Sequence, residues 1–294
     1  MSENTFLPIT LEEVKRLGWS QVDIVIVSGD AYVDHPSFGT AVIGRVLEAA
    51  GYRVAIIPQP NWRDDLRDFR KFGQPRLFFG VTSGVMDSMV NHYTAARRLR
   101  HDDAYTPGGT SGFRPDYATY VYSRILKQLY PDTPVVIGGV EASMRRLAHY
   151  DYWSDTLKPS ILAECPADLL VYGMGEKTMV KVANMLADNE PLYKLYTIPQ
   201  VAYVGSNVPR AKDLIVLHSF EECKKSKRLH AENFHRIEVE SNKIEAAMLV
   251  QPIGDKFVVV NPPEPPMTTA EMDASFDLPY MRQPHPKYKK RGSV

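Results

Sequence analysis

The chain has 294 residues with 35 basic and 35 acidic side chains, so its formal net charge is zero. This composition is that of an ordinary globular protein and excludes the strongly basic surface typical of nucleic-acid binders. No apolar run reaches the roughly 20 residues that a membrane span needs, and no secretory signal is visible, so we expect no membrane partner and a cytoplasmic location.

Short apolar runs alternate with helical patterns in the first part of the chain. The runs predict strands at 22–27, 52–57, 76–80, 134–139 and 168–173. Apolar residues recur at helical spacing and predict helices at about 38–50, 85–99, 117–129 and 176–188. Because strands that alternate with helices form right-handed crossovers, residues 1–195 predict a doubly wound α/β domain with a parallel sheet, of the Rossmann type.

The pattern changes after residue 195. Two strand-like segments lie at 200–205 and 213–219. Ser219, at the end of the second segment, forms a predicted capping box with Glu222 that opens a helix. Residues 246–261 predict two strands joined by a tight turn. We therefore expect residues 196–260 to form a smaller α+β extension of the first domain.

Residues 261–294 contain seven prolines and predict a linker that leads to another domain. Thr268 or Thr269 is expected to cap one short helix. Its neighbours Phe276, Leu278, Tyr280 and Met281 are apolar and should pack, either on the domain itself or on a further domain. Residues from about Arg282 onward are expected to be mobile, because termini without docking partners fray.

The stretch "DAYVDHPSFG" at 30–39 holds the residue types of a hydrolytic triad. Triads draw their members from separated elements, and the chain lacks a G-x-S-x-G elbow, so hydrolysis is not supported. Ser37 is expected to cap a helix that begins at Phe38. Asp34 and His35 are not needed for that cap and stay open to a binding role.

Several small or acidic residues follow the predicted strands. The carboxyl ends of parallel strands meet at one edge of a sheet, and ligands of doubly wound folds bind there. No Walker A or G-x-G-x-x-G motif is present, and neither the histidines nor the two cysteines have metal-site spacing. We predict no catalytic residue and no metal ligand, but a substrate or cofactor pocket formed by Asp34, His35, Ser83, Gly84, Gly139, Glu141, Gly173, Gly175 and Glu176.

Eight stretches, in order over nearly the whole chain, resemble the YgiQ-like radical SAM protein family. They are "SGDAYVDHPSFG", "MDSMVNHYTA", "DAYTPGG", "RPDYATYVYSRILK", "VVIGGVEASMRRLAHYDYW", "ADLLVYGMGE", "VVVNPPEPPMTTAEMD" and "DLPYMRQPHPKY". The resemblance implies a cobalamin-binding-like N-terminal domain followed by a radical SAM barrel. It also implies a CxxxCxxC motif in the full-length protein, whose [4Fe–4S] cluster cleaves S-adenosylmethionine to a radical.

This chain departs from the family pattern at the cluster motif, because its only cysteines are Cys165 and Cys223. We therefore expect an accessory N-terminal module that is inactive alone and whose partner is the radical SAM barrel. Cobalamin stays open as a ligand, but no D-x-H-x-x-G motif supports it: Asp34 and His35 are adjacent, and Gly39 lies four residues after His35. His35 is thus not expected to ligate cobalt.

Two other interpretations remain open. The chain fits a free-standing nucleotide- or corrinoid-binding module without catalysis, although such a module has no use for a proline-rich linker. A complete transferase or hydrolase of the doubly wound class is the third interpretation, and it lacks a recognisable nucleophile.

Overall fold

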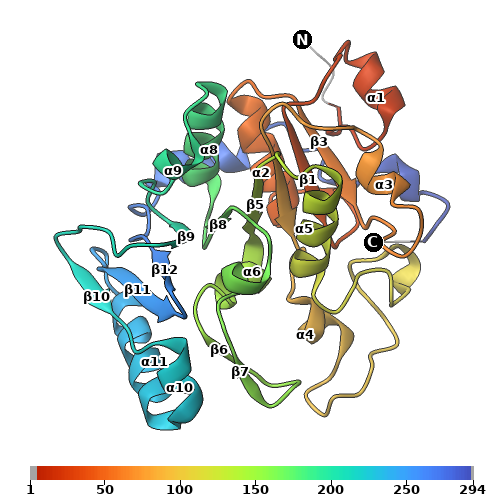
Figure 1. Ribbon diagram of the computed structural model, residues 1–294. Helices are drawn as coiled ribbons and strands as arrows, with labels where there is room; N and C mark the ends of the chain where they lie inside the picture. Colours follow the sequence, from red (N-terminus) through yellow and green to blue (C-terminus); the bar gives the residue numbers. More distant parts are fainter. Residues whose placement is uncertain (1–4, 293–294) are drawn as a thin grey trace.

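The computed structural model describes residues 5–292. Within them, nine strands form one twisted sheet in the order β10-β11-β12-β9-β8-β5-β4-β1-β3 (Figure 1). The strands are β1 (Ile24–Ser28), β3 (Val54–Pro58), β4 (Phe78–Thr82), β5 (Val135–Gly138), β8 (Leu169–Val171), β9 (Val201–Gly205), β10 (Leu214–Val216), β11 (Met248–Ile253) and β12 (Lys256–Val260). The predicted α/β fold with a doubly wound sheet is confirmed.

Helices cover both faces of the sheet, as Figure 1 shows. Their bounds are α1 (Leu11–Arg16), α2 (Gly39–Ala49), α3 (Arg67–Arg70), α4 (Ser88–His92), α5 (Ala118–Leu129), α6 (Gly139–Met144), α7 (Ile161–Glu164), α8 (Glu176–Ala187), α9 (Leu192–Leu195), α10 (Phe220–Lys225), α11 (Lys227–Ser241) and α12 (Thr269–Phe276). No helix within residues 5–292 is long and apolar enough to cross a bilayer.

The five parallel strands β3, β1, β4, β5 and β8 are the buried centre of the fold. Successive side chains of β1 point to opposite faces, so Val25 and Val27 join the core under α5 whereas Ile24 and Ile26 join the core under α2 and α8. A strand buried on both faces must be apolar throughout, which explains the uninterrupted run. Chain order reverses between β1 and β4, and this reversal is the topological switch point of the sheet.

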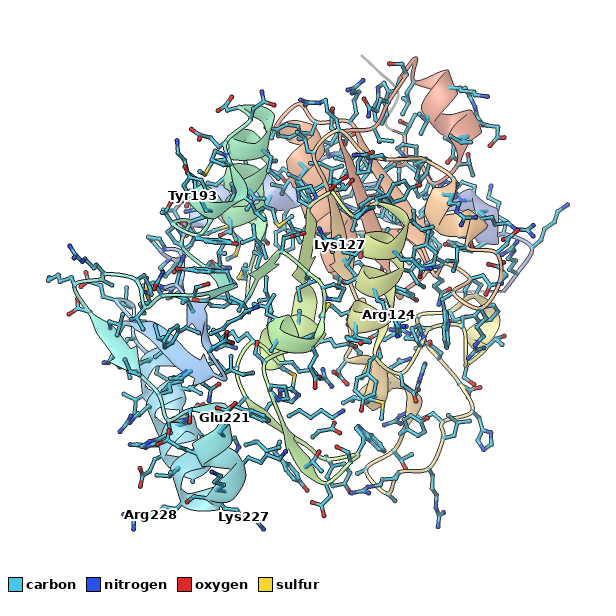
Figure 2. The ribbon with its side chains drawn as sticks, in the orientation of Figure 1. Arg124, Lys127, Tyr193, Glu221, Lys227 and Arg228 are labelled. Carbon is cyan, nitrogen blue, oxygen red and sulfur yellow. The ribbon has the colours of Figure 1, made fainter. Side chains whose placement is uncertain are left out.

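The segment after residue 195 extends the same sheet. Strand β9 pairs antiparallel with β8, β12 pairs with β9, and β11 pairs with β12. Helices α10 and α11 lie beside this extension, and their charged residues Glu221, Lys227 and Arg228 are labelled in Figure 2. A domain boundary at residue 195 therefore stays a prediction, because the sheet continues across it.

Two helix starts predicted from the sequence are confirmed. Ser219 and Glu222 form a capping box at the start of α10. Thr268 and Glu271 form another at α12, so the cap is Thr268 and not Thr269. Each box satisfies two backbone N–H groups at its helix start.

The predicted cap at Ser37 was wrong. Helix α2 begins at Gly39, and its N-cap is Phe38, which makes no side-chain capping bond. The Ser37 side chain is exposed, and its backbone N–H donates to Nδ1 of His35 over 3.1 Å. The local hydrogen bond between Ser37 and His35 therefore forms a turn before the helix and does not cap it.

The predicted helix at 85–99 was too long. Asp87 caps α4 by accepting hydrogen bonds from Met89 and Val90, but the helix ends at His92. Tyr93 turns away to pack against Trp153, with ring centroids 4.8 Å apart, and its hydroxyl donates to Asp116 over 3.0 Å. These distant contacts override the helical spacing of the apolar residues.

The predicted mobility from Arg282 onward was wrong for the described residues. Strand β13 (Gln283–Pro284) pairs with β2 (Val33–Asp34), and His285 and Tyr288 are buried. The apolar residues that precede β13 have different environments. Tyr280 is buried and Leu278 packs against the core, so both dock on the domain itself, whereas Phe276 is exposed. Residues 293–294 of the predicted linker lie outside the described residues.

Candidate functional site

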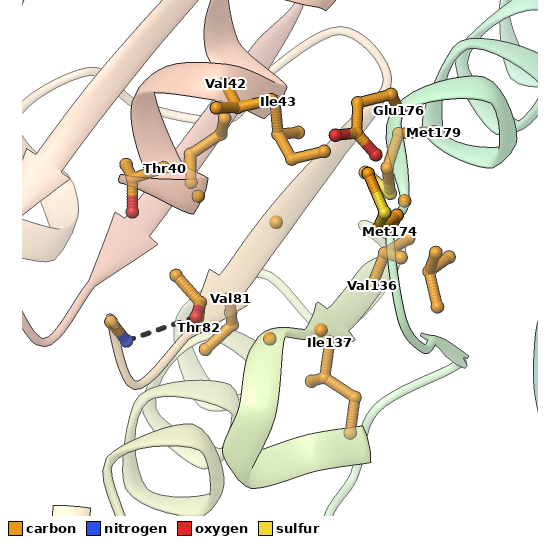
Figure 3. A pocket seen from close by; sticks show the side chains of 18 of the residues that line it. Thr40, Val42, Ile43, Val81, Thr82, Val136, Ile137, Met174, Glu176 and Met179 are labelled. Carbon is orange, nitrogen blue, oxygen red and sulfur yellow. Dashed lines mark hydrogen bonds between the residues drawn. The ribbon is translucent and has the colours of Figure 1, made fainter. Parts of the chain in front are cut away.

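A cavity of about 330 Å³ lies at the switch point of the sheet. Its floor is formed by the carboxyl ends of β1, β4, β5 and β8, and the first turns of α2 and α8 form two of its walls (Figure 3). Ile26, Val136 and Val171 give the floor an apolar surface. A concave, largely apolar site at this position is where doubly wound folds bind ligands.

Five residues of the predicted pocket line this cavity: Gly84, Gly139, Gly173, Gly175 and Glu176. Position 139 requires a glycine, both because of its backbone conformation and because a side chain would not fit there. Its φ is +81°, and a Cβ at this position would overlap Oγ1 of Thr82. The small residues at these strand ends therefore let neighbouring turns approach closely and leave the cavity open.

The other four predicted residues, Asp34, His35, Ser83 and Glu141, do not line the cavity. Glu141 is buried, and its two carboxylate oxygens accept hydrogen bonds from the backbone N–H groups of Ser88 at 3.0 Å and Thr119 at 2.9 Å. Ser83 donates to the carbonyl of Met86. Both side chains hold the loops around the cavity in place instead of facing a ligand.

Asp34 forms a buried ion pair with Arg45 of α2. The Arg45 guanidinium also donates to Glu48 and to the carbonyl of Thr5. Both Asp34 oxygens accept hydrogen bonds from Arg45, and Oδ2 also accepts one from the backbone N–H of Met281 at 2.9 Å. Asp34 therefore joins α2 to the C-terminal segment, which is a structural role.

A second buried ion pair holds the loops that follow β1 and β4. Arg114 lies 2.5 Å from Asp30 Oδ1 and donates to the carbonyl of Ser83, while Asp30 Oδ2 accepts from the N–H of Val85. Burial raises the pKa of Asp30 to about 6, and the positive charge of Arg114 opposes that rise. Arg114 lies in the long segment between α4 and α5, which is thereby fixed against the sheet edge.

The side walls of the cavity come from residues that the pattern of strand ends did not indicate. Thr40 and Ile43 lie on α2, Thr82 ends β4, and Met174 lies in the turn before α8. The helix that follows a parallel strand starts at the carboxyl edge, so its first turn contributes to a site there. That rule, applied to α2, would have found Thr40 and Ile43.

The residues present do not fit a base-off corrinoid. His35 is the histidine whose sequence surroundings come closest to the D-x-H-x-x-G motif. It does not line the cavity, and its Nδ1 accepts the Ser37 N–H. We therefore derive no chemistry through cobalt.

The residues present also do not fit an iron–sulfur cluster. Cys165 and Cys223 are both buried, and burial raises the pKa of the Cys165 thiol to about 11. Cluster ligands are thiolates, usually three or four of them. Within residues 5–292 no group of three or more His, Cys, Asp or Glu side chains is placed to hold a metal.

Comparison with known sequences identifies the relatives of this chain. Residues 6–294 match the sequence model of the family described as "Radical SAM N-terminal". The chain is similar to UPF0313 proteins of Porphyromonas gingivalis, with 58% identity over 97% of the chain, and of Bacteroides thetaiotaomicron, with 57% identity over 97%. A UPF0313 protein of Clostridium botulinum strain Kyoto is 48% identical over the whole chain. The chain spans 45%, 48% and 45% of these relatives' lengths, about half of each.

Proposed function

The chain belongs to the radical SAM N-terminal family, and we propose that it supplies a substrate or cofactor pocket to a longer radical SAM iron–sulfur protein. In that protein a [4Fe–4S] cluster and S-adenosylmethionine would generate the radical. The cluster would be held outside these residues, since the two buried cysteines do not fit it. The role of this chain is then to bind and orient a ligand.

The cavity at the switch point is the observation that carries this proposal. It combines an apolar floor, glycine turns from three strand ends and one carboxylate, Glu176. Ligand pockets commonly have volumes of about 300–1,000 Å³, so the cavity fits a small molecule or one ring system of a larger one.

We propose that the rest of the longer protein covers the mouth of this cavity. Exposed apolar side chains gather on the loops and short helices that follow β4, β5 and β8, and they include Val85, Val90, Leu99, Met144, Tyr152 and Met174. Exposed apolar patches mark interaction surfaces. Because the relatives are about twice as long as this chain, their remaining half is the partner that this surface fits.

Filling the cavity tests the pocket. Ile43→Trp places a large ring on the α2 wall and should abolish binding of uncharged ring compounds, because their volume is then occupied. The measurement is ligand-observed NMR with benzyl alcohol, indole and adenosine on the purified chain. Ile244→Trp is the matched control, since Ile244 is 81% exposed and outside the cavity, and it should leave binding unchanged. Absence of binding to the wild type, or equal binding by Ile43→Trp, would contradict the proposal.

Footprinting tests the covering partner. Met144 and Met174, which are 63% and 58% exposed in this chain, should be oxidised several-fold more slowly by hydroxyl radicals in the full-length protein. Phe234 on α11 is 62% exposed and away from the strand ends, so its rate should not change. Equal rates for the two methionines in both forms would favour the free-standing module instead.

A further inference from the structure

We infer that the cavity selects a ring-shaped group that is uncharged or positively charged and donates a hydrogen bond to Glu176, and that it discriminates against anions. This inference rests on the pocket proposed above and specifies the chemical class of its ligand. It follows from the position of one carboxylate and from the nature of every other side chain around it.

Glu176 is the first residue of α8 and lines the cavity. Its Oε2 atom is buried and has no hydrogen-bond partner among the described residues. Figure 3 shows the carboxylate between Ile43 and Met174, with its oxygens directed into the cavity. A buried acceptor without a partner is unfavourable, so a rotation of the Glu176 carboxylate that brings this oxygen to a ligand donor in the cavity is favourable.

Of the three other polar side chains of the cavity, Thr40 and Thr82 are engaged with the protein, whereas Ser37 is exposed to solvent. Thr40 donates to Ser28 over 3.2 Å, and Oγ1 of Thr82 accepts the N–H of Gly84 at 3.1 Å. Among the lining residues of the described chain, no Lys, Arg or His is present, and Glu176 is the sole charged side chain. An anionic group would therefore meet a carboxylate in an apolar surrounding without a cation to offset the repulsion.

Helix N-termini attract anions, and the first residues of three helices, α2, α6 and α8, line the cavity. The first turn of α6 contains the carboxylate of Glu141. At α8 the Glu176 carboxylate already occupies the first turn and compensates the positive end of the helix dipole. At α2 the first turn has no acidic residue, so a phosphate at this end is the competing interpretation. The charge of the preferred ligand separates the two.

The apolar walls determine the shape of the bound group. Ile26, Val136 and Val171 form the floor, and Ile43, Met174 and Met179 stand around it. A planar ring buries its faces against such aliphatic side chains, and methionine sulfur makes favourable contacts with aromatic rings. A ring that carries an amino or hydroxyl group matches both the walls and Glu176.

Three probes of one ring and different charge test this inference: benzylamine, benzyl alcohol and benzoate. The wild-type chain should bind benzylamine most tightly and benzoate at least about 10-fold more weakly, because a hydrogen bond to a charged group strengthens binding by about that factor. In Glu176→Gln the benzylamine affinity should fall about 10-fold and the preference over benzoate should disappear. Glu12→Gln, an exposed first-turn glutamate of α1 outside the cavity, should change neither.

The possible results separate the inference from the proposed pocket. Equal affinities for the three probes, with binding still lost in Ile43→Trp, would overturn the ligand class and leave the pocket standing. Tightest binding of benzoate would support the anion site at α2 and overturn the inference. Absence of binding by all three probes would overturn the inference, while the indole and adenosine measurements would still decide whether the pocket exists. The order of the three probe affinities is measured on the wild-type chain, so a folding defect in Glu176→Gln would not affect that part of the test.

Discussion

Replacing Gly29 with alanine is expected to destabilise the protein by at least about 3 kcal/mol, the upper range for overpacking of a close-packed interior. Gly29 follows β1 at the switch point of the sheet. A Cβ at this position would overlap the backbone carbonyl oxygen of Ser83 and lie 3.0 Å from its carbon. Ser83 cannot move freely, because its carbonyl also accepts the Arg114 guanidinium. Urea unfolding of the purified chain measures the loss.

Gly39→Ala is the matched control for this substitution. A Cβ on Gly39 meets no atom within 4 Å, and Gly39 is the first residue of α2. Alanine there should be neutral or stabilising by up to about 1 kcal/mol, since it lowers the entropy of the unfolded chain and favours the helix. Similar unfolding free energies for the two variants would show that the loops after β1 and β4 are not in close contact.

Replacing Asp34 with alanine is expected to cost about 3–5 kcal/mol, the usual cost of removing one partner of a buried ion pair. The Arg45 side chain is only 2% exposed, so its positive charge would remain buried with Glu48 and one backbone carbonyl as partners. The backbone N–H of Met281 would also lose its acceptor. Urea unfolding measures the stability, and tryptic cleavage after Lys287 should accelerate because the C-terminal segment is less firmly docked.

Asp65→Ala serves as the control, since the ion pair of Asp65 with Arg67 is exposed and such pairs contribute little to stability. Combining Asp34→Leu with Arg45→Met should restore part of the stability lost in Asp34→Ala, because no unpaired charge stays buried. A loss below about 1 kcal/mol in Asp34→Ala would mean that Glu48 and the Thr5 carbonyl satisfy Arg45, and that Asp34 does not hold the C-terminal segment.

The sequence by itself determined the fold class. Runs such as residues 22–27 are apolar at every position, which only a strand buried on both faces requires. Their alternation with helical patterns leads to a doubly wound sheet. The two residues of a capping box, such as Ser219 and Glu222, lie within four positions of each other. These signals are local, so a single sequence contains them in full. The glycines of the cavity are part of the same signal, because a turn at a strand end needs them at a fixed position.

Only the tertiary structure decided which acidic side chains at the strand ends face the cavity and which hold the protein together. Asp34 pairs with Arg45 of the next helix, and Glu141 accepts backbone N–H groups from α4 and α5, whereas Glu176 keeps a buried oxygen without a partner. A buried carboxylate must find a cation or backbone donors. Those donors come from elements far along the chain, and the spacing of residues around the carboxylate does not specify them. The docking of residues 283–288 follows the same rule, since its partners lie on β2, some 250 positions earlier.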